Sequence, residues 1–284
     1  MKRFTTLIQP LELRANLADP RWVLLDCRFD LANPGAGRLA WQAGHLPGAQ
    51  YAHLDHDLSA PVGAASGRHP LPDAEVLAGR LGQWGIGNDS QVIAYDAANG
   101  AHAARLWWLL RWVGHTDVAV LDGGFAAWQR AQLPVDADVP KRPARQFVAQ
   151  VRSAAWLTTA AVAESLVRGD IALIDARSAD RFAGQNETID PVAGHVPGAR
   201  NHPFATNLDA DNRFLPAPEL RRRWSRTLGG APSAQAVCMC GSGVTACHDL
   251  LALEIAGLGG ARLYAGSWSE WIRDPSRPIA TGAA

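Results

Sequence analysis

Short apolar runs alternate with longer amphipathic stretches along the chain. We assign as strands the runs VLLD (23–26), QVIAYD (91–96), DVAVLD (117–122), ALID (172–175), AVCM (236–239) and ARLY (261–264). The stretches AARLWWLLRWVG (103–114) and ACHDLLALEIAG (246–257) carry apolar residues at i, i+3 and i+4 and end at glycine, which is typical of helices. Wholly apolar short strands separated by helices predict an α/β fold, in which helices flank both faces of a central, mostly parallel sheet.

The same pattern occurs twice. Four segments of the first half return in the same order in the second half, displaced by 143 (121 to 264) to 150 (43 to 193) positions: WVLLDCRFD with IALIDARSAD, AGHLPGAQ with AGHVPGAR, QVIAYDAANGAH with QAVCMCGSGVTA, and LDGGFAAW with YAGSWSEW. Such a repeat indicates two copies of one structural unit. We therefore predict domains at 1–135 and 154–284, joined by a polar, proline-bearing linker at 136–153.

Composition narrows the class of protein. Lys and Arg together number 27, as do Asp and Glu, so the formal net charge is zero. This balance argues against general affinity for nucleic acid or for an anionic membrane. No apolar stretch approaches the roughly 18 residues of a membrane span, and the N-terminus lacks the apolar core of a secretory signal. Together with the uneven spacing of four cysteines, these features predict a cytoplasmic protein with reduced thiols.

Three of the four cysteines lie close together at 238, 240 and 247. A structural zinc site usually needs four ligands from paired Cys/His knuckles, and no second pair exists, so no metal is expected here. Cys238 and Cys247 fall inside the predicted strand and helix, and with Cys27 they are expected to be core residues. Cys240 differs, because it begins the Gly-Ser-Gly loop between strand and helix. Backbone N–H groups at such a junction favour anions and therefore favour the thiolate form of a cysteine there.

The repeat provides a comparison within the chain. At the position equivalent to Cys240 the first copy has Asp96, a carboxylate that cannot act as a sulfur nucleophile. We therefore expect one active copy and one supporting copy. A phosphatase loop is excluded because that chemistry needs an arginine six positions after the cysteine, where this chain has Ala246.

Together these motifs resemble the tandem-domain sulfurtransferases of the rhodanese superfamily. The resemblance is carried by CGSGVTAC (240–247), by GHLPGA (44–49) and GHVPGA (194–199), and by GSWSEW (266–271), and it covers nearly the whole chain. It implies two tandem rhodanese-like domains and transfer of a sulfane sulfur from thiosulfate or 3-mercaptopyruvate to cyanide or a thiol through a Cys240 persulfide, without a cofactor. The expected persulfide- and anion-binding loop comprises Gly241, Ser242, Gly243, Val244, Thr245 and Ala246.

The resemblance also implies roles for residues outside the loop. Ser242 matches a serine that, in the mercaptopyruvate branch, works with a first-domain histidine and an upstream aspartate. His45 is the candidate histidine, although residues 33–45 hold no acidic residue, and a loop-bracing role for His45 is an equal alternative. Arg181 matches the substrate-binding arginine, whereas the second arginine of that branch has no match in 185–194. Arg68 lies in a Gly/Pro-rich loop with His69; we expect a solvated loop, the alternative being a contact with the interdomain cleft.

Other assignments remain open at this level. Trp268 follows a predicted strand end and is a candidate wall of the substrate pocket. The main alternative function is a non-catalytic sulfur-relay or binding module, in which Cys240 carries a persulfide received from a protein donor. A redox-sensing role for Cys240 with a neighbouring cysteine ranks last, because Cys238 and Cys240 are too constrained across a strand end to pair easily. The expected partners are thus a small-molecule sulfur donor, a thiol or cyanide acceptor and, as an option, a protein sulfur acceptor.

Overall fold

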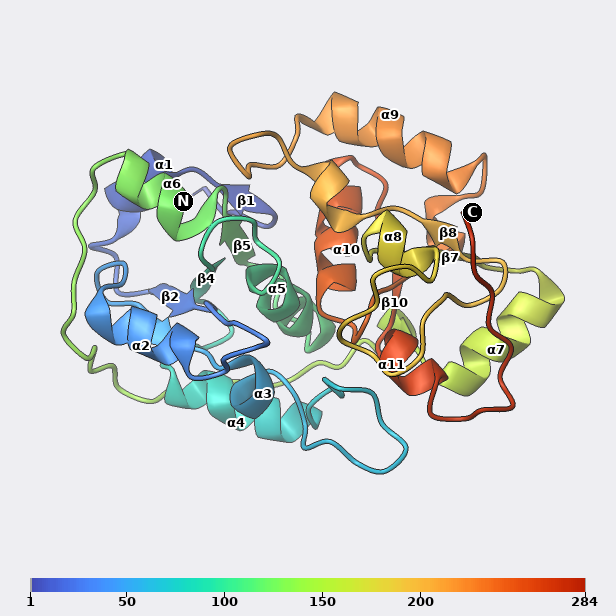
Figure 1. Cartoon of the computed structure of the whole chain (residues 1–284). Coiled ribbons are helices and arrows are strands. Elements are labelled where there is room, and N and C mark those ends of the chain that lie inside the picture. The colour runs from blue at the N-terminus through green and yellow to red at the C-terminus, as the bar shows by residue number, and fades with distance from the viewer. Residues whose placement is uncertain (1, 284) are drawn as a thin grey trace. The chain divides into compact units, whose positions relative to one another are not determined.

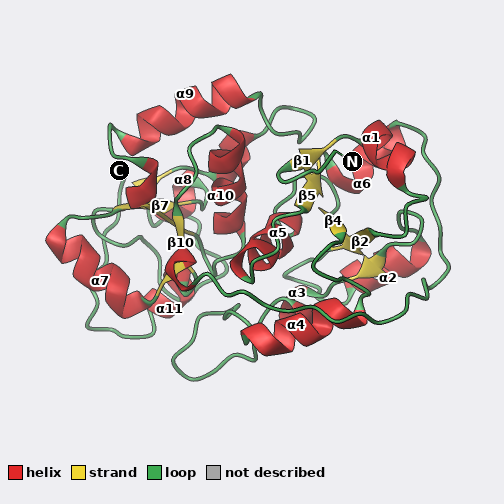
Figure 2. Cartoon of the chain, turned by 180° about the vertical axis from the view of Figure 1, so that it is seen from behind, coloured by secondary structure: helices red, strands yellow, loops and turns green. Residues whose placement is uncertain are grey.

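The computed structural model describes residues 2–283 and divides the chain into two compact units. The first unit contains the residues up to Ala60, Leu71–Arg152 and Ala210–Arg213; the second contains Pro61–Pro70, Ser153–Asp209 and the residues from Phe214 onward. Each half of the sequence therefore contributes one short loop to the unit that the other half builds. Figures 1 and 2 show the elements of both units by position and by type.

The first unit is built on a parallel five-stranded sheet in the order β1-β5-β4-β2-β3. Its central strands are wholly buried, and α5 packs on β4 and β5. Its elements are β1 (Leu7–Ile8), α1 (Pro10–Asn16), β2 (Trp22–Asp26), α2 (Ala36–Ala43), β3 (Gln50–Tyr51), α3 (Leu54–Asp57), α4 (Ala74–Gln83), β4 (Gln91–Tyr95), α5 (Ala103–Trp112), β5 (Val118–Leu121) and α6 (Gly124–Arg130).

The second unit repeats this plan with the sheet order β6-β10-β9-β7-β8, again parallel throughout. Helix α10 packs on β9, β10 and α9. The elements are η1 (Ser153–Ala155), β6 (Trp156–Leu157), α7 (Thr159–Arg168), β7 (Ala172–Asp175), α8 (Ala179–Phe182), β8 (Arg200–Asn201), η2 (Phe204–Asn207), α9 (Ala217–Leu228), η3 (Ser233–Gln235), β9 (Ala236–Met239), α10 (Thr245–Ile255), β10 (Arg262–Tyr264) and α11 (Ser267–Trp271).

The α/β fold class is confirmed, and the predicted strands and helices lie where the apolar pattern placed them. Local chemistry sets their ends. Helix α7, for example, begins at Thr158, whose hydroxyl accepts the Ala161 N–H at 3.2 Å, and ends at Gly169 in the left-handed conformation (φ 69°). Each sheet has its own apolar core, which includes Trp22 and Trp128 in the first unit and Trp268 and Trp271 in the second.

The structural division departs from the expected boundaries at three places, one of which is Ala210–Arg213, expected in the second domain but part of the first unit. The segment expected as a linker is bound along the first unit: the N–H groups of Arg145, Gln150 and Arg152 donate to the carbonyls of Gly82, Val113 and Trp112 at 2.8–2.9 Å. Residues 61–70, expected as a loop of the first domain, belong instead to the second unit. Among the described residues, no helix has the length and apolar character needed to cross a membrane.

Candidate active site

Cys240 directly follows β9 and lies at the carboxyl end of the second sheet. Only 2% of the residue is exposed, yet its sulfur faces its own loop, because Sγ accepts the Gly243 N–H at 3.1 Å. The Cys240 main chain is fixed on both sides: its N–H donates to Ser267 Oγ at 3.1 Å, and its carbonyl accepts the Trp268 N–H at 3.0 Å. The sulfur is therefore held in one position before any substrate binds.

The loop depends on two unusual backbone conformations. Gly243 has a φ of 78°, and a Cβ at this position would lie 2.4 Å from the Ala265 carbonyl oxygen, so only glycine fits. Ser267 has a φ of 53°, which is rare for a residue with a side chain. Its hydroxyl donates to the Tyr264 carbonyl at 2.9 Å while accepting from Cys240. The left-handed backbone of Ser267 thus places its hydroxyl within hydrogen-bonding distance of the Cys240 N–H.

The equivalent loop of the first unit is occupied by a carboxylate. Asp96 Oδ1 accepts the N–H groups of Ala98 and Gly100 at 3.2 and 2.9 Å, and Oδ2 accepts those of His102 and Ala103 at 2.9 and 3.3 Å. Four amides of one strand–helix junction therefore converge on a single anion. Asp96 occupies the position equivalent to Cys240, so in the first unit this strand–helix junction accommodates a negative charge.

Ser242 pairs with His69, which the sequence analysis placed in a loop beside Arg68 but did not pair with this serine. His69 Nδ1 and Ser242 Oγ lie 2.7 Å apart, and both residues are buried, at 4% and 6% exposed. The expected partner, His45, is engaged elsewhere: its Nδ1 lies 2.8 Å from the Trp41 carbonyl oxygen, and its ring stacks on Trp41 at 4.8 Å. Of the two readings for His45, these contacts fit loop bracing, and the serine–histidine pair is formed by His69 instead.

Arg68 and Arg181 meet at one carboxylate. Asp190 accepts from Arg68 Nη1 at 2.8 Å and from Arg181 Nη2 at 3.1 Å, and Arg181 Nε also donates to Glu187 at 3.0 Å. Burial alone would raise the pKa of Glu187, but the hydrogen bonds from Arg181 and from two backbone N–H groups outweigh it and lower that pKa. The solvated loop expected for Arg68 and His69 is therefore wrong: Arg68 N–H donates to Ser269 Oγ at 3.0 Å, and the loop packs on α11.

These arginines border the cysteine loop. A Cβ placed on Gly241 would lie 3.2 Å from Arg68 Nη2, 3.6 Å from Asp190 Oδ2 and 3.7 Å from Arg181 Nη2. Gly241, which follows Cys240, thus has no side chain, and the guanidinium groups of Arg68 and Arg181 occupy the adjacent space. Two cations beside a held sulfur can bind an anionic donor and orient it toward that sulfur.

The chain is similar to known proteins over nearly its whole length. The model of the rhodanese-like domain matches residues 9–131 and again 158–274. The chain belongs to the rhodanese-like family. This confirms the resemblance and the tandem arrangement, and the enzyme class that its curated relatives share is that of a sulfurtransferase.

Three of these relatives illustrate the similarity. A "Probable 3-mercaptopyruvate sulfurtransferase" of Pseudomonas aeruginosa is 50% identical over 279 residues, covering 97% of this chain and 98% of that protein. The thiosulfate sulfurtransferase of Cricetulus griseus is 31% identical, covering 92% and 88%. The crystal structure of SseA from Escherichia coli, a 3-mercaptopyruvate sulfotransferase, superposes with a TM-score of 0.81 at 31% identity and covers 94% of this chain and all of SseA.

The remaining thiols of this rhodanese-like chain are core residues, as expected. Cys27, Cys238 and Cys247 are at most 1% exposed, and burial raises the pKa of Cys27 and of Cys238 well above that of an ordinary thiol.

Asp249 on α10 is also fully buried in the second unit. Burial raises the pKa of its carboxyl well above the ordinary value, while Asn207 donates to Oδ1 at 2.8 Å. Within residues 2–283 there is no group of three or more His, Cys, Asp or Glu side chains arranged to hold a metal ion.

The Trp268 side chain lies in the apolar core of the second unit. Its side chain is fully buried, its indole N–H donates to the Val192 carbonyl at 2.9 Å, and the Arg177 guanidinium lies over its ring at 4.7 Å. Arg177 in turn binds Asp175 at 2.7 Å and the Gly194 carbonyl at 2.8 Å, as Arg28 binds Asp26 and Gly44 in the first unit. Only the main chain of Trp268 contributes to the site, through its bond to Cys240.

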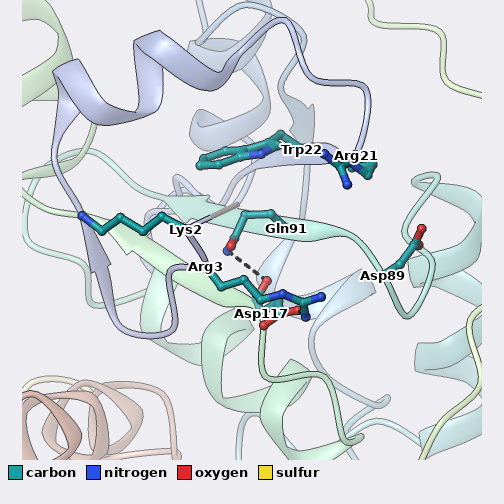
Figure 3. Close-up of a pocket in the computed structure, with 7 residues that line it drawn as sticks. All are labelled: Lys2, Arg3, Arg21, Trp22, Asp89, Gln91 and Asp117. Carbon is teal, nitrogen blue, oxygen red and sulfur yellow. Dashed lines mark hydrogen bonds and ion pairs between the residues drawn. The ribbon is translucent and has the colours of Figure 1, made fainter.

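The pocket drawn in Figure 3 belongs to the first unit. It is at the amino ends of β2 and β4, whereas Asp96 follows the carboxyl end of β4. Its charges are partly paired, since Arg3 binds Asp117 and Arg21 binds Asp19. Ligands of parallel sheets bind at the carboxyl ends of the strands, so we assign this pocket no role in catalysis.

Proposed function

We propose that this sulfurtransferase takes sulfur from 3-mercaptopyruvate, with thiosulfate as the alternative donor, and passes it to a thiol or to cyanide through a persulfide on Cys240. The observation that carries the proposal is the position of the Cys240 sulfur, which accepts an N–H of its own loop at the carboxyl end of β9 beside two guanidinium groups. The 50% identical Pseudomonas relative supports the choice of donor.

The proposed reaction has two steps. In the first, the Cys240 thiolate attacks the sulfur of the donor: an S–S bond forms, the donor's C–S bond breaks, and its electron pair leaves with carbon as the enolate of pyruvate, which then takes up a proton. In the second, the acceptor attacks the outer sulfur, the S–S bond breaks, and the thiolate of Cys240 is restored; with cyanide the product is thiocyanate. Such covalent catalysis predicts ping-pong kinetics.

The Asp96 loop supports the role of the backbone. In the first unit four amides hold a carboxylate, and in the second the copied loop presents Cys240 and Gly243 at the same junction. A persulfide is an anion that extends beyond the thiolate by one atom, so fixed N–H donors stabilise it without reorganising. We assign Gly241 to Ala246 this binding role.

Ser242 and His69 supply the proton chemistry. Their 2.7 Å hydrogen bond lies in the cysteine loop and is buried, so a proton can pass between the hydroxyl and the imidazole without bulk water. We propose that this pair delivers the proton that the pyruvate enolate requires. Arg181 and Arg68 bind the donor's carboxylate at the same loop.

The test is the rate of thiocyanate formation from each donor with cyanide as acceptor. Cys240→Ser should reduce the rate to background, while Cys27→Ala, which removes a buried thiol of the other unit, should retain activity. Intact-mass analysis after exposure to the donor should show one additional sulfur on the wild type and none on Cys240→Ser. Equal rates for Cys240→Ser and the wild type would refute the proposal.

The same measurements separate the alternative of a sulfur relay. A sulfur adduct that forms only with a persulfide-bearing protein, and never with 3-mercaptopyruvate or thiosulfate, would favour the relay. The low exposure of Cys240, at 2%, favours small donors instead, because a partner's sulfur would have to reach a buried atom. A cytoplasmic location stays a prediction from the sequence.

A further inference from the structure

Arg68, Arg181, Asp190 and Glu187 form an ion-pair cluster at the cysteine loop, and Arg177 Nη1, 3.6 Å from Glu187, joins it to the Arg177–Asp175 pair. Arg68 binds Asp190, Arg181 binds both Asp190 and Glu187, and the two carboxylates are joined by the Asp190 N–H, which donates to Glu187 Oε1 at 3.0 Å. The side chains of Asp190 and Glu187 are only 1% and 3% exposed, whereas those of Arg68 and Arg181 are 26% and 18% exposed. The carboxylates thus lie behind the guanidinium groups, which face outward.

Asp190 binds both arginines of the cluster and lies close to Gly241, the residue that follows Cys240. Each of its two oxygens binds a different arginine, and Oδ2 lies 3.6 Å from the Cβ position of Gly241. One carboxylate therefore fixes the separation of the two guanidinium groups and, at the same time, places a buried negative charge next to the donor site.

The charges of the cluster balance: Arg68, Arg181 and Arg177 are offset by Asp190, Glu187 and Asp175. A 3-mercaptopyruvate ion brings one carboxylate, whereas thiosulfate brings two negative charges into the same space. The second charge gains nothing from arginines that are already neutralised, and it meets the field of Asp190 in a partly buried site where screening is weak.

We propose that Asp190 is a specificity-determining positioning residue, which sets the spacing of Arg68 and Arg181 and selects a singly charged sulfur donor over a doubly charged one. This rests on the proposed function of Cys240. It also accounts for a missing feature of the sequence, since the arginine absent from 185–194 is replaced by Arg68, on a loop more than a hundred positions earlier.

The experiment compares kcat/KM for thiosulfate and for 3-mercaptopyruvate in the wild type and in Asp190→Asn. The asparagine keeps the size of the side chain and removes its charge, so we expect the ratio of thiosulfate to mercaptopyruvate kcat/KM to rise about tenfold at low ionic strength, and less at high salt. The change should appear mainly as a lower KM for thiosulfate, because the buried charge that opposes its second negative charge is gone, while kcat for either donor changes little.

Two variants serve as controls. Asp180→Asn removes a charge from the same segment, but the Asp180 carboxylate accepts from the Arg181 main-chain N–H and from Asn186 rather than holding the Arg181 guanidinium group, so the donor ratio should stay at the wild-type value. Asp190→Glu restores the charge and should return the ratio most of the way to wild type, which a general folding defect in Asp190→Asn would not allow.

The outcomes are distinguishable. If wild type transfers sulfur from neither donor, the proposed function fails. If the wild type is active and Asp190→Asn leaves the donor ratio within about twofold of the wild-type value, or if Asp180→Asn shifts it equally, the role of Asp190 is overturned while the function stands.

Discussion

The carboxylate of Asp96 offers the most direct test of whether the strand–helix loops bind anions. Asp96 is 2% exposed and accepts four backbone N–H groups. The perturbation is Asp96→Ala, which removes the acceptor and leaves the loop otherwise unchanged. Asp96→Asn is the milder variant, because its amide keeps one accepting oxygen but turns an NH₂ group toward two of the donors.

The expected cost follows from which donors can reach water. Gly100 and Ala103 are buried and would be left without an acceptor, whereas Ala98 and His102 are partly exposed and can bond to solvent. An unsatisfied buried donor costs about 1–3 kcal/mol, so with two such donors we expect Asp96→Ala to lower the free energy of unfolding of the first unit by about 2–6 kcal/mol. For Asp96→Asn about half of that is expected.

The assay is equilibrium unfolding in urea, combined with hydrogen exchange of the peptide that covers residues 96–103. Faster exchange should be confined to the first unit. Asp138→Ala, at an exposed position of the same unit, is the matched control and should stay within about 0.5 kcal/mol of wild type. A change for Asp96→Ala no larger than that of the control would refute the view that these amides hold a buried charge, and with it the support that Asp96 gives to the Cys240 loop.

Two further predictions concern histidines of the second unit. His69→Gln should lower kcat for 3-mercaptopyruvate about 10- to 100-fold with little change in KM, because proton delivery through Ser242 is lost. Adding Ser242→Ala to this variant should lower kcat little further. Steady-state kinetics that show an unchanged kcat in His69→Gln would contradict this prediction. Burial lowers the pKa of His202 from 6.5 to about 4, so its native pKa lies below the unfolded value; the stability it contributes is fully present above pH 6.5 and is lost as the pH falls toward 4. Relative to His202→Phe, the wild type should therefore lose about 3 kcal/mol of unfolding free energy between pH 6.5 and 4, and parallel pH profiles of the two proteins would disprove the assignment.

Most of the fold could be predicted because the longer strands and helices are each recognisable from a contiguous stretch of the sequence. The strands VLLD, QVIAY and AVCM are continuous apolar runs that need burial on both faces, and the helical periodicity after them is strong. The two-residue strands β1, β3, β6 and β8 were not predicted, because two residues carry no periodicity. They exist only because a neighbouring strand offers its unpaired edge.

The candidate site was predicted in part for the same reason. Cys240 and its loop are contiguous in sequence, so their geometry could be anticipated. The partner of Ser242 could not, since His69 lies 173 positions away and the repeat drew attention to His45 instead. Asp190 and Glu187 were not predicted, because the resemblance implied an arginine within residues 185–194. The two acidic residues of that segment are the ones that hold Arg68 and Arg181.

The exchange of short loops between the two units has a consequence for how such a gene can change. A fragment beginning at Ser153 would contain every strand of the second sheet and the reactive sulfur, yet it would lack Arg68 and His69, which are encoded in the other half. The two halves of the chain are thus not separable: the first half, which has Asp96 at the position of the nucleophile, encodes ten residues of the unit that contains Cys240.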